Sequence, residues 1–420
     1  MTAEALVPND PHPWRATITL GLLAIAAGVI APMVAEPLLG HNYWSIPGDA
    51  WLSLQAAHYV PQGTYPLIYE AGTIRGGFDA GPLLPLVLAP VAWIGTLLHL
   101  HESYPLPRRH PSMWLVFGPY SLACAVPLLY ATRSLATQLF VRRRRAILQL
   151  AVLLIVFVPS AIVYGHYEDV LALALVFVAF RDLFTDRPLR GALLLAAAIG
   201  FKQWSLLAVP IFVVACPPSV RRRVLLRSVL PPGILMASFL ALDFKYASVS
   251  LLHPPTFPRF GHPALWVSMT TSSLTSAPER SGAFVVAFLV AWLIRRERDP
   301  AFIISALGCV LLARVLFEDV VHAYYLAPGI ATLLMSAWTR RTGIVTKFTL
   351  GAALLLAFPF HPARLPWWLA VYALLVAVLY EPVGQLVRRS RVRRDEPGEP
   401  KPSGCVTAPG ELLAFQTAPK

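Results

Sequence analysis

The sequence predicts an all-α polytopic membrane protein with about 12 transmembrane helices, and three observations lead to that fold class. Of the 420 residues, 56% are hydrophobic and only 14% are charged. Apolar runs recur along nearly the whole chain. These runs are solid, as in "AILQLAVLLIVFVPSAIVY", whereas strands of a membrane β-barrel would alternate apolar and polar residues. Because only helices and closed barrels span bilayers, the runs are expected to be helices.

Arginine clusters lie between the apolar runs of this chain, whose net charge is +13. Such clusters typically stay on the cytoplasmic side of a membrane, so we interpret the charge as a topology signal rather than a nucleic-acid surface. A multi-pass protein of the plasma membrane with both termini in the cytoplasm is therefore expected. The clusters lie at 142–145, 181–190, 221–227, 295–298, 340–341 and 388–394.

The individual spans follow from the apolar runs. A cytoplasmic N-terminus at 1–14 precedes the first span at 16–38, and the membrane domain is expected to cover 15–394. The tail at 395–420 is rich in Pro and Gly, and its composition predicts disorder. The later runs lie near 82–100, 113–132, 147–164, 168–181, 189–202, 203–216, 225–243, 282–294, 301–316, 320–338, 344–359 and 367–386.

One pair of runs does not fit simple alternation. An odd number of crossings must connect the outer loop at 43–78 to the inner cluster at 142–145, yet two runs lie between them. One of the two is therefore expected to be partial or re-entrant. Prolines at 82, 85 and 90 make the run at 82–100 the weaker candidate for a full span.

The cysteines give no sign of a metal or a disulfide framework. They are scattered through the spans and the tail, and no CxxC or Cys/His spacing connects them. We therefore predict neither a disulfide framework nor a zinc site, and we expect no cofactor. The four positions are Cys124, Cys216, Cys309 and Cys405.

Charged residues at the rim of membrane spans are costly to place there, so each is a candidate for function. The first group is in the loop after the first span, where Asp49 stands in "PGDAWLSLQAAHYV". Trp51, Leu54 and Ala57 recur at helical spacing and predict an amphipathic helix lying at the interface. Asp49 is then either the cap of this helix or a catalytic carboxylate. Asp79, in "GFDAGP", is a further acid of the same loop.

Two more groups are placed on the same outer side. The segment "YGHYED" holds His166, Glu168 and Asp169 at the start of a short helix, either as a polar, capped helix turn or as part of a site. Lys202 follows in "GFKQWS", between two short apolar runs. Its side chain either snorkels to the interface or pairs with an anionic head group.

The fourth group is "ARVLFEDVVHAYYLAP" at 313–328. Arg314 and Glu318 are four residues apart, which suits a structural salt bridge. That pair leaves His322 and the tyrosines Tyr324 and Tyr325 unexplained. Acids together with Arg, Lys and His on one side predict an active site for an anionic lipid, because Arg binds phosphate well. A proton-coupled transporter would place its acids near mid-membrane in related halves, and the sequence shows neither feature.

The order of these motifs resembles the GT-C superfamily of integral-membrane glycosyltransferases. In particular it is similar to the actinobacterial polyprenyl-phosphate-mannose-dependent α-mannosyltransferases of the PimE type. The matching stretches are "DAWLSLQAAHYVPQGTYPLIY", "GHYEDVLALALVFVAF", "RGALLLAAAIGFKQW" and "RVLFEDVVHAYYLAP", within roughly residues 15–340. The sequence around the acid in "WSIPGDAW" departs from the family pattern, so Asp49 and Asp79 both stay candidates for the leading carboxylate.

The resemblance implies transfer of a sugar, with mannose favoured, from a polyprenyl-phosphate donor to a cell-envelope glycan or glycolipid acceptor. Asp49 or Asp79 would act as the general base, with inversion at the anomeric carbon. Arg314, Lys202 and His322 would bind the donor phosphate, and no metal would be required. A transporter or flippase of a lipid-linked sugar and a non-catalytic membrane partner are the alternatives. The substrate-binding candidates are His166, Glu168, Asp169, Glu318, Tyr324 and Tyr325.

Overall fold

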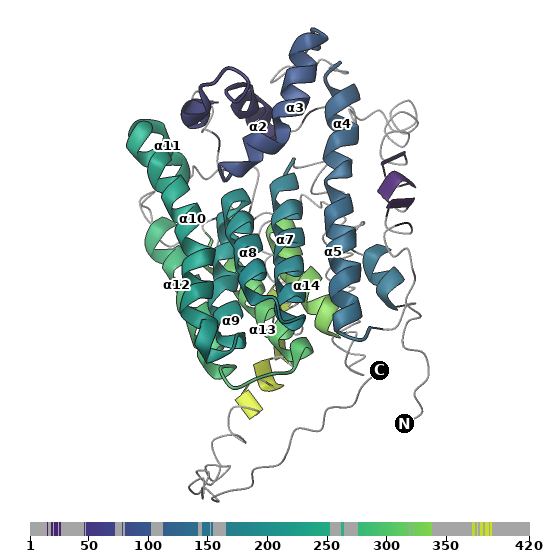
Figure 1. Ribbon diagram of the computed structural model, residues 1–420, viewed down its shortest axis with the longest axis vertical. Coiled ribbons are helices and arrows are strands. Elements are labelled where there is room, and N and C mark those ends of the chain that lie inside the picture. The colour runs from purple at the N-terminus through teal and green to yellow at the C-terminus, as the bar shows by residue number, and fades with distance from the viewer. Residues whose placement is uncertain are drawn as a thin grey trace, which may run out of the picture.

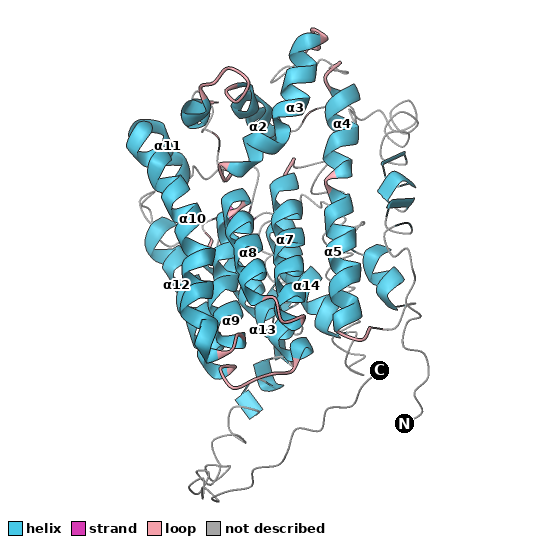
Figure 2. Cartoon of the chain, in the orientation of Figure 1, coloured by secondary structure: helices cyan, strands magenta, loops and turns pink. Residues whose placement is uncertain are grey.

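The computed structural model describes most of the chain between residues 48 and 337, and nearly all of that part is helical (Figures 1 and 2). Single positions between 15 and 46, at 78 and 153, and between 372 and 388 are also described. Most of the predicted first span and most of the run at 367–386 lie outside the described residues, as do the run at 344–359 and the tail. The continuous ranges are 48–71, 80–101, 112–141, 145–151, 165–252, 276–318 and 323–337, with 262–263 and 320–321 as isolated pairs.

The first described elements lie at one end of the molecule, uppermost in Figure 1. They are helix α2 (Gly48–His58), the 3-10 turn η1 (Tyr65–Glu70) and helix α3 (Leu83–Leu97). The face of α2 formed by Ala50, Ser53, Leu54 and Ala57 is buried, and α2 packs against α3. The predicted helix after Asp49 is thus present, and its buried face lies against protein.

Among the residues that the structure describes, three helical segments are long and apolar enough to cross a membrane, and they support an α-helical membrane protein. They are Trp114–Gln138, Pro218–Leu242 and Pro300–Phe317. The first comprises α4 (Trp114–Ala123) and α5 (Ala125–Gln138) and covers the predicted run at 113–132. By contrast, α3 in the run at 82–100 has only 15 residues, with Pro90 inside it. Of the runs at 82–100 and 113–132, the earlier one therefore forms a helix too short to count as a candidate membrane span. The total of about 12 spans stays a prediction.

The central helix of the bundle is α7 (Tyr167–Phe184), which packs against α5 and against α8 (Pro188–Phe201). Its sequence is apolar around most of its circumference, and most of its side chains are buried, as expected for a helix surrounded by others. An 18-residue helix is about 27 Å long, so its two ends lie far apart.

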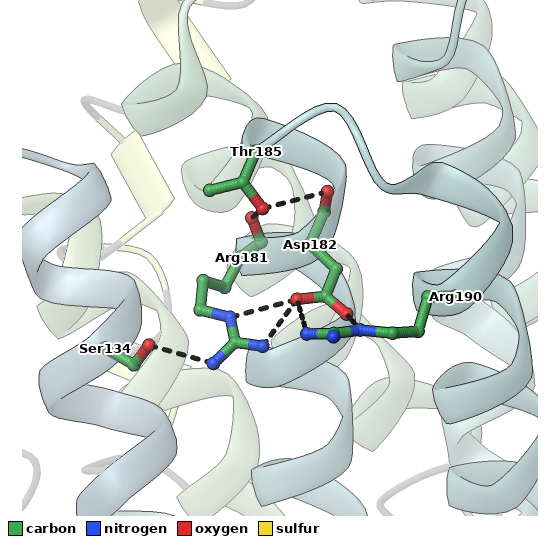
Figure 3. Close-up of polar contacts among 5 residues, drawn as sticks. All are labelled: Ser134, Arg181, Asp182, Thr185 and Arg190. Carbon is green, nitrogen blue, oxygen red and sulfur yellow. Dashed lines mark hydrogen bonds and ion pairs between the residues drawn. The ribbon is translucent and has the colours of Figure 1, made fainter. Parts of the chain in front are cut away.

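The end of α7 is tied to the start of α8 by a buried carboxylate (Figure 3). Asp182 is 1% exposed and accepts from Arg181, at 2.5 and 3.0 Å, and from Arg190, at 2.9 Å to Nη2. Arg181 also donates to Ser134 of α5 at 3.2 Å. Part of the predicted cytoplasmic cluster at 181–190 therefore forms a structural ion network between three helices.

The second half of the bundle packs on the first through α10 (Arg221–Leu242), which lies against α8. Only a narrow stripe of α10 is buried, while apolar side chains such as Leu230 and Ile234 face outward. An outward apolar face of this length suits lipid. The other elements are η4 (Gln203–Leu207), α9 (Ala208–Ala215), η5 (Pro218–Val220), α11 (Phe244–Leu252), α12 (Ser276–Leu293), α13 (Pro300–Ala313), η7 (Arg314–Phe317), η8 (Ala323–Leu326) and α14 (Ala327–Ala337).

A two-residue strand pair is the one departure from helix among the elements that the structure describes. Strand β1 (His262–Pro263) pairs antiparallel with β2 (Val320–Val321). The pairing places the middle of the Pro-rich loop at 253–268 beside the segment that connects Glu318 to Tyr324. The other residues of this loop lie outside the described ranges.

Candidate functional site

The four groups of polar residues meet where α2 and α7 begin and α8 and α13 end. The imidazole of His166 lies between two carboxylates. Its Nδ1 is 2.8 Å from Glu168 Oε1, and its Nε2 is 2.8 Å from Asp49 Oδ2. The second contact has the distance of an ion pair without the angle of a hydrogen bond. Residues from the first and second groups are thus in direct contact.

Lys202 brings the third group into the same cluster. Its ammonium is 3.1 Å from Glu168 Oε1, the oxygen that also contacts His166. The local backbone explains the reach: α8 ends at Phe201, and Lys202 is extended, which turns the chain out of the helix. Neither reading of Lys202 from sequence included this contact with a protein carboxylate, and pairing with an anionic head group stays a prediction.

Trp204 connects Asp169 to the fourth group. The indole Nε1 donates to Asp169 Oδ1 at 2.6 Å. The guanidinium carbon of Arg314 lies 5.9 Å from the Trp204 ring and 5.3 Å from the Tyr325 ring, both within the range of cation–π contacts. Glu318 forms an ion pair with Arg314 Nε at 3.0 Å, as the spacing of four predicted.

The two tyrosines complete the cluster. Tyr324 stacks on His166 with ring centroids 4.0 Å apart, and Tyr325 meets Tyr324 edge-on at 4.8 Å. A path of direct contacts therefore runs from Asp49 through His166 and the tyrosines to Arg314. Segments that are far apart in sequence build this single polar cluster inside an apolar bundle.

Two glycines allow the segments to approach. Gly165, with φ +76°, lies against α2, and a Cβ there would be 2.7 Å from the Ala50 Cβ. Gly81 donates its N–H to the Phe201 carbonyl at 2.9 Å, and a Cβ there would overlap the Gly200 carbonyl. The first contact holds the start of α2 beside His166. The second holds the start of α3 beside Lys202.

Exposure separates one member of the cluster from the rest. The Asp49 side chain is 52% exposed, whereas those of His166 and Glu168 are 3% exposed. Lys202 and Arg314 are partly accessible, at 17% and 10%. Asp49 is thus the carboxylate that can meet a molecule from outside, while the predicted substrate contacts His166 and Glu168 act from behind it.

The electrostatics of the cluster act on both partners of the Asp49–His166 contact. Burial tends to raise the pKa of the Asp49 carboxyl, but the contact with His166 outweighs it and the pKa is lowered. For His166, in the loop before α7, burial tends to lower the pKa. The negative charge of Glu168 and the contacts with Asp49 outweigh it and raise the pKa to about 10. Asp49 is therefore ionised at neutral pH.

The cluster also contains atoms suited to a metal. Ligand atoms of His166, Glu168 and Asp169 lie within 4.8 Å of one another, and Glu168 Oε2 is buried without a partner among the described residues. However, the Lys202 ammonium already contacts Glu168. A divalent ion at Oε2 would share this carboxylate with the ammonium and be repelled by it, so the arrangement fits internal cations better than a metal.

The sequence-based candidates divide into those that the structure describes and two that it does not. Asp79 and His322 lie outside the described residues, so their roles stay predictions. Capping explains neither acid of "YGHYED", because α7 is preceded by His166 and no side chain caps it. Trp204 was missed as a site residue. The available signal was an indole donor two residues after Lys202 in an otherwise apolar stretch.

This arrangement can accept a proton at Asp49 and place positive charge nearby. A comparison with known protein families found no match for the chain, and a comparison with curated proteins found none either. The contacts and charges of the cluster are therefore what a functional proposal can be built on.

Proposed function

We propose that the protein is a membrane glycosyltransferase that uses a polyprenyl-phosphate sugar, with mannose as the favoured sugar. The observation that carries the proposal is Asp49: a half-exposed, ionised carboxylate held by a buried histidine in the same cluster as Lys202. A general base needs both accessibility to its substrate and a charge that is present at the working pH.

In the proposed reaction, Asp49 takes the proton of the acceptor hydroxyl as its oxygen attacks the anomeric carbon of the donor. The bond from that carbon to the phosphate oxygen breaks, and the electron pair leaves with the lipid phosphate. Lys202 and Arg314 stabilise the negative charge that develops there, a contribution that is often the largest in catalysis. Attack from the face opposite the leaving group inverts the anomeric centre.

Two features support a membrane-bound donor and acceptor. The cluster lies at one end of a bundle whose outward faces are apolar, so a lipid tail can stay in the bilayer while its head group meets the cluster. The arginines at 181–190 and 295–298 lie at the opposite ends of α7, α8 and α13, the helices that lead to the site. With those arginines in the cytoplasm, the site opens on the extracytoplasmic face.

The test is sugar transfer by membranes supplied with radiolabelled polyprenyl-phosphate mannose, comparing wild type with Asp49→Asn at equal expression. Asn keeps the shape of Asp but takes no proton, so we expect a loss of about 100-fold or more. Asp186→Asn is the matched control. Asp186 is exposed at the far end of α7 and has φ +57°, which Asn also adopts readily, so this variant should keep full activity.

Asp79→Asn is the third variant, because the sequence leaves that acid as a rival base. Loss of transfer in Asp79→Asn alone would keep the enzyme class and move the base to Asp79. Equal activity of all three variants would contradict base catalysis by either acid. A wild-type protein that transfers no sugar but moves the intact donor across the membrane would contradict the enzyme proposal and favour a flippase.

A further inference from the structure

The charge state of His166 follows from the geometry of its ring. A neutral imidazole carries one N–H and one bare lone pair. In this structure both ring nitrogens lie 2.8 Å from a carboxylate oxygen, one of Glu168 and one of Asp49. The Nδ1 contact has the geometry of a hydrogen bond, whereas the Nε2 contact has only the distance of an ion pair. The negative charge of a carboxylate beside each nitrogen favours a proton on both, which makes the ring an imidazolium.

The surroundings of the ring favour the same state. The ionisable groups around it are Asp49 from α2 and both Glu168 and Asp169 from α7, with Lys202 from the end of α8 behind Glu168. The Tyr324 ring from η8 covers one face, and an aromatic face attracts a cation. With the histidine charged, Glu168 and Asp49 each contact a cation, and Asp169 accepts from the Trp204 indole. With it neutral, Glu168 would keep only Lys202 and the Asp49 carboxylate would lose the cation it contacts.

The two carboxylates differ in freedom. Glu168 is buried and is held by Lys202 as well as by His166, so it is the fixed end of the arrangement. Asp49 is half exposed and is held on the protein side through His166. The ring is itself fixed by Glu168 at one nitrogen and by the stacked Tyr324 on its face. Any restriction on the Asp49 carboxylate from this side is therefore transmitted by the histidine.

We propose that His166 is a positioning residue, an imidazolium held between Glu168 and Asp49 that fixes the Asp49 carboxylate and keeps it ionised. This inference rests on the proposed function for its catalytic meaning. The histidine transfers no proton itself. The acceptor proton goes to Asp49 and then to water, since Asp49 is accessible. Loss of the positive ring would leave a base that is both less well oriented and protonated at higher pH.

The first test measures the ring directly and needs no substrate. Protein labelled with 15N-histidine gives imidazole spectra across a pH series, and the His166 signal is assigned by its absence in His166→Gln. We expect both ring nitrogens to stay protonated above pH 8, since the pKa is raised to about 10. A signal of a neutral tautomer at pH 7 would overturn the proposal.

A second variant keeps this test decisive if His166→Gln does not fold. Glu168→Gln retains a side-chain oxygen for Nδ1 but removes the charge, so the same signal should lose its proton at lower pH than in wild type. That shift both assigns the signal and tests the role of Glu168. An unchanged titration of the His166 signal in Glu168→Gln would contradict the proposal that Glu168 holds the ring as an imidazolium.

The second test is the pH profile of sugar transfer. In His166→Gln the acid limb of kcat/KM should move to higher pH, because the cation that lowers the pKa of Asp49 is gone. KM should change less than kcat. Arg190→Gln, at the other end of the bundle, controls for general weakening of the fold and should leave the profile unchanged. A fall in kcat at every pH with an unmoved acid limb would reduce His166 to a packing role and overturn the proposal.

The pH dependence of unfolding gives a third reading. The folded-state pKa of His166 is raised above the ordinary value of 6.5, so the folded chain holds a proton that the unfolded chain loses as pH rises. The stabilisation is complete below about pH 6.5 and declines toward pH 10. His166→Gln should remove this decline, and a decline that persists in the variant would contradict the assignment.

The outcomes separate this inference from the proposed function. A wild-type protein that transfers no sugar contradicts the function, while the imidazole spectra still decide the charge of His166. Bound metal is the competing explanation of the same cluster. A stoichiometric divalent ion in purified wild type that is lost in His166→Gln would replace the imidazolium by a metal centre and overturn the proposal.

Discussion

At the scale of single residues, the candidate site is a set of paired charges in an apolar bundle. Each buried ionisable group described in the cluster has a partner of opposite charge or a strong donor: Glu168 has Lys202, Arg314 has Glu318, and Asp169 has the Trp204 indole. Unpaired buried charges cost several kcal/mol, so pairing is the condition for keeping such groups in the bundle. Trp204 has the broadest role, because it contacts both an acid and a cation.

Replacement of Trp204 by Phe should destabilise the protein. Phe keeps only one of the two rings, so some packing is lost together with the donor to Asp169, and a buried carboxylate without its hydrogen bond costs about 1–3 kcal/mol. Thermal unfolding in detergent measures the change. Trp93→Phe is the matched control, because Trp93 is 54% exposed on α3, and its effect should stay within about 0.5 kcal/mol. Equal effects in the two variants would contradict the role of the indole N–H.

At the scale of elements, the site depends on where helix ends meet. Asp49 is at the start of α2, and His166 immediately precedes α7. For this contact the backbone at Gly165 must lie against Ala50 with a positive φ. Residues other than glycine rarely adopt that backbone conformation. The close approach of Gly81 to the end of α8 has the same function on the side of Lys202.

Substitution of Gly165 by Ala should separate α2 from the start of α7. The positive φ costs about 1–2 kcal/mol with a Cβ present, and the added methyl group overlaps Ala50. Displacement of Asp49 should lower transfer by roughly 100-fold, since small misplacements of a reacting group are costly. Gly63→Ala is a close control, because Gly63 also has a positive φ, +73°, but has no atom within 4 Å of an added Cβ.

The two variants should thus share the backbone cost and differ in activity. Unfolding temperature and transfer rate, measured on the same preparations, separate the two effects. If Gly63→Ala lost as much activity as Gly165→Ala, the contact between α2 and the start of α7 would not be what positions Asp49.

At the scale of the whole molecule, the helices run between two chemically different ends. α7 begins beside the polar cluster and ends in the arginine-rich turn of Figure 3, and α8 returns from that turn to Lys202. α13 likewise begins after the arginines at 295–298 and ends at Arg314. The faces between the ends are apolar where they point outward. This polarity predicts which end faces the cytoplasm.

Cysteine labelling in intact cells tests the predicted sidedness. Ser219→Cys lies in the turn between α9 and α10, and Gln62→Cys follows α2, and both positions are exposed. The native Cys124, Cys216 and Cys309 are buried, so a Cys405→Ser background should label weakly. A membrane-impermeant maleimide should then label Gln62→Cys in intact cells and Ser219→Cys only after permeabilisation. The reverse pattern would place the site in the cytoplasm and remove support for the polyprenyl-phosphate donor.

The sequence by itself determined the helical class, the positions of most described helices and the residues worth inspecting, because apolar periodicity and charge placement are local properties. It also gave the Arg314–Glu318 pair, which one helical turn relates. The contacts of His166 with Asp49 and Tyr324, and of Lys202 with Glu168, appeared only in the tertiary structure. Each joins the ends of different helices, and which ends meet depends on how the helix faces pack. No local sequence pattern predicts how the helices pack, so the contacts of Trp204 and the charge of His166 could be inferred only from the tertiary structure.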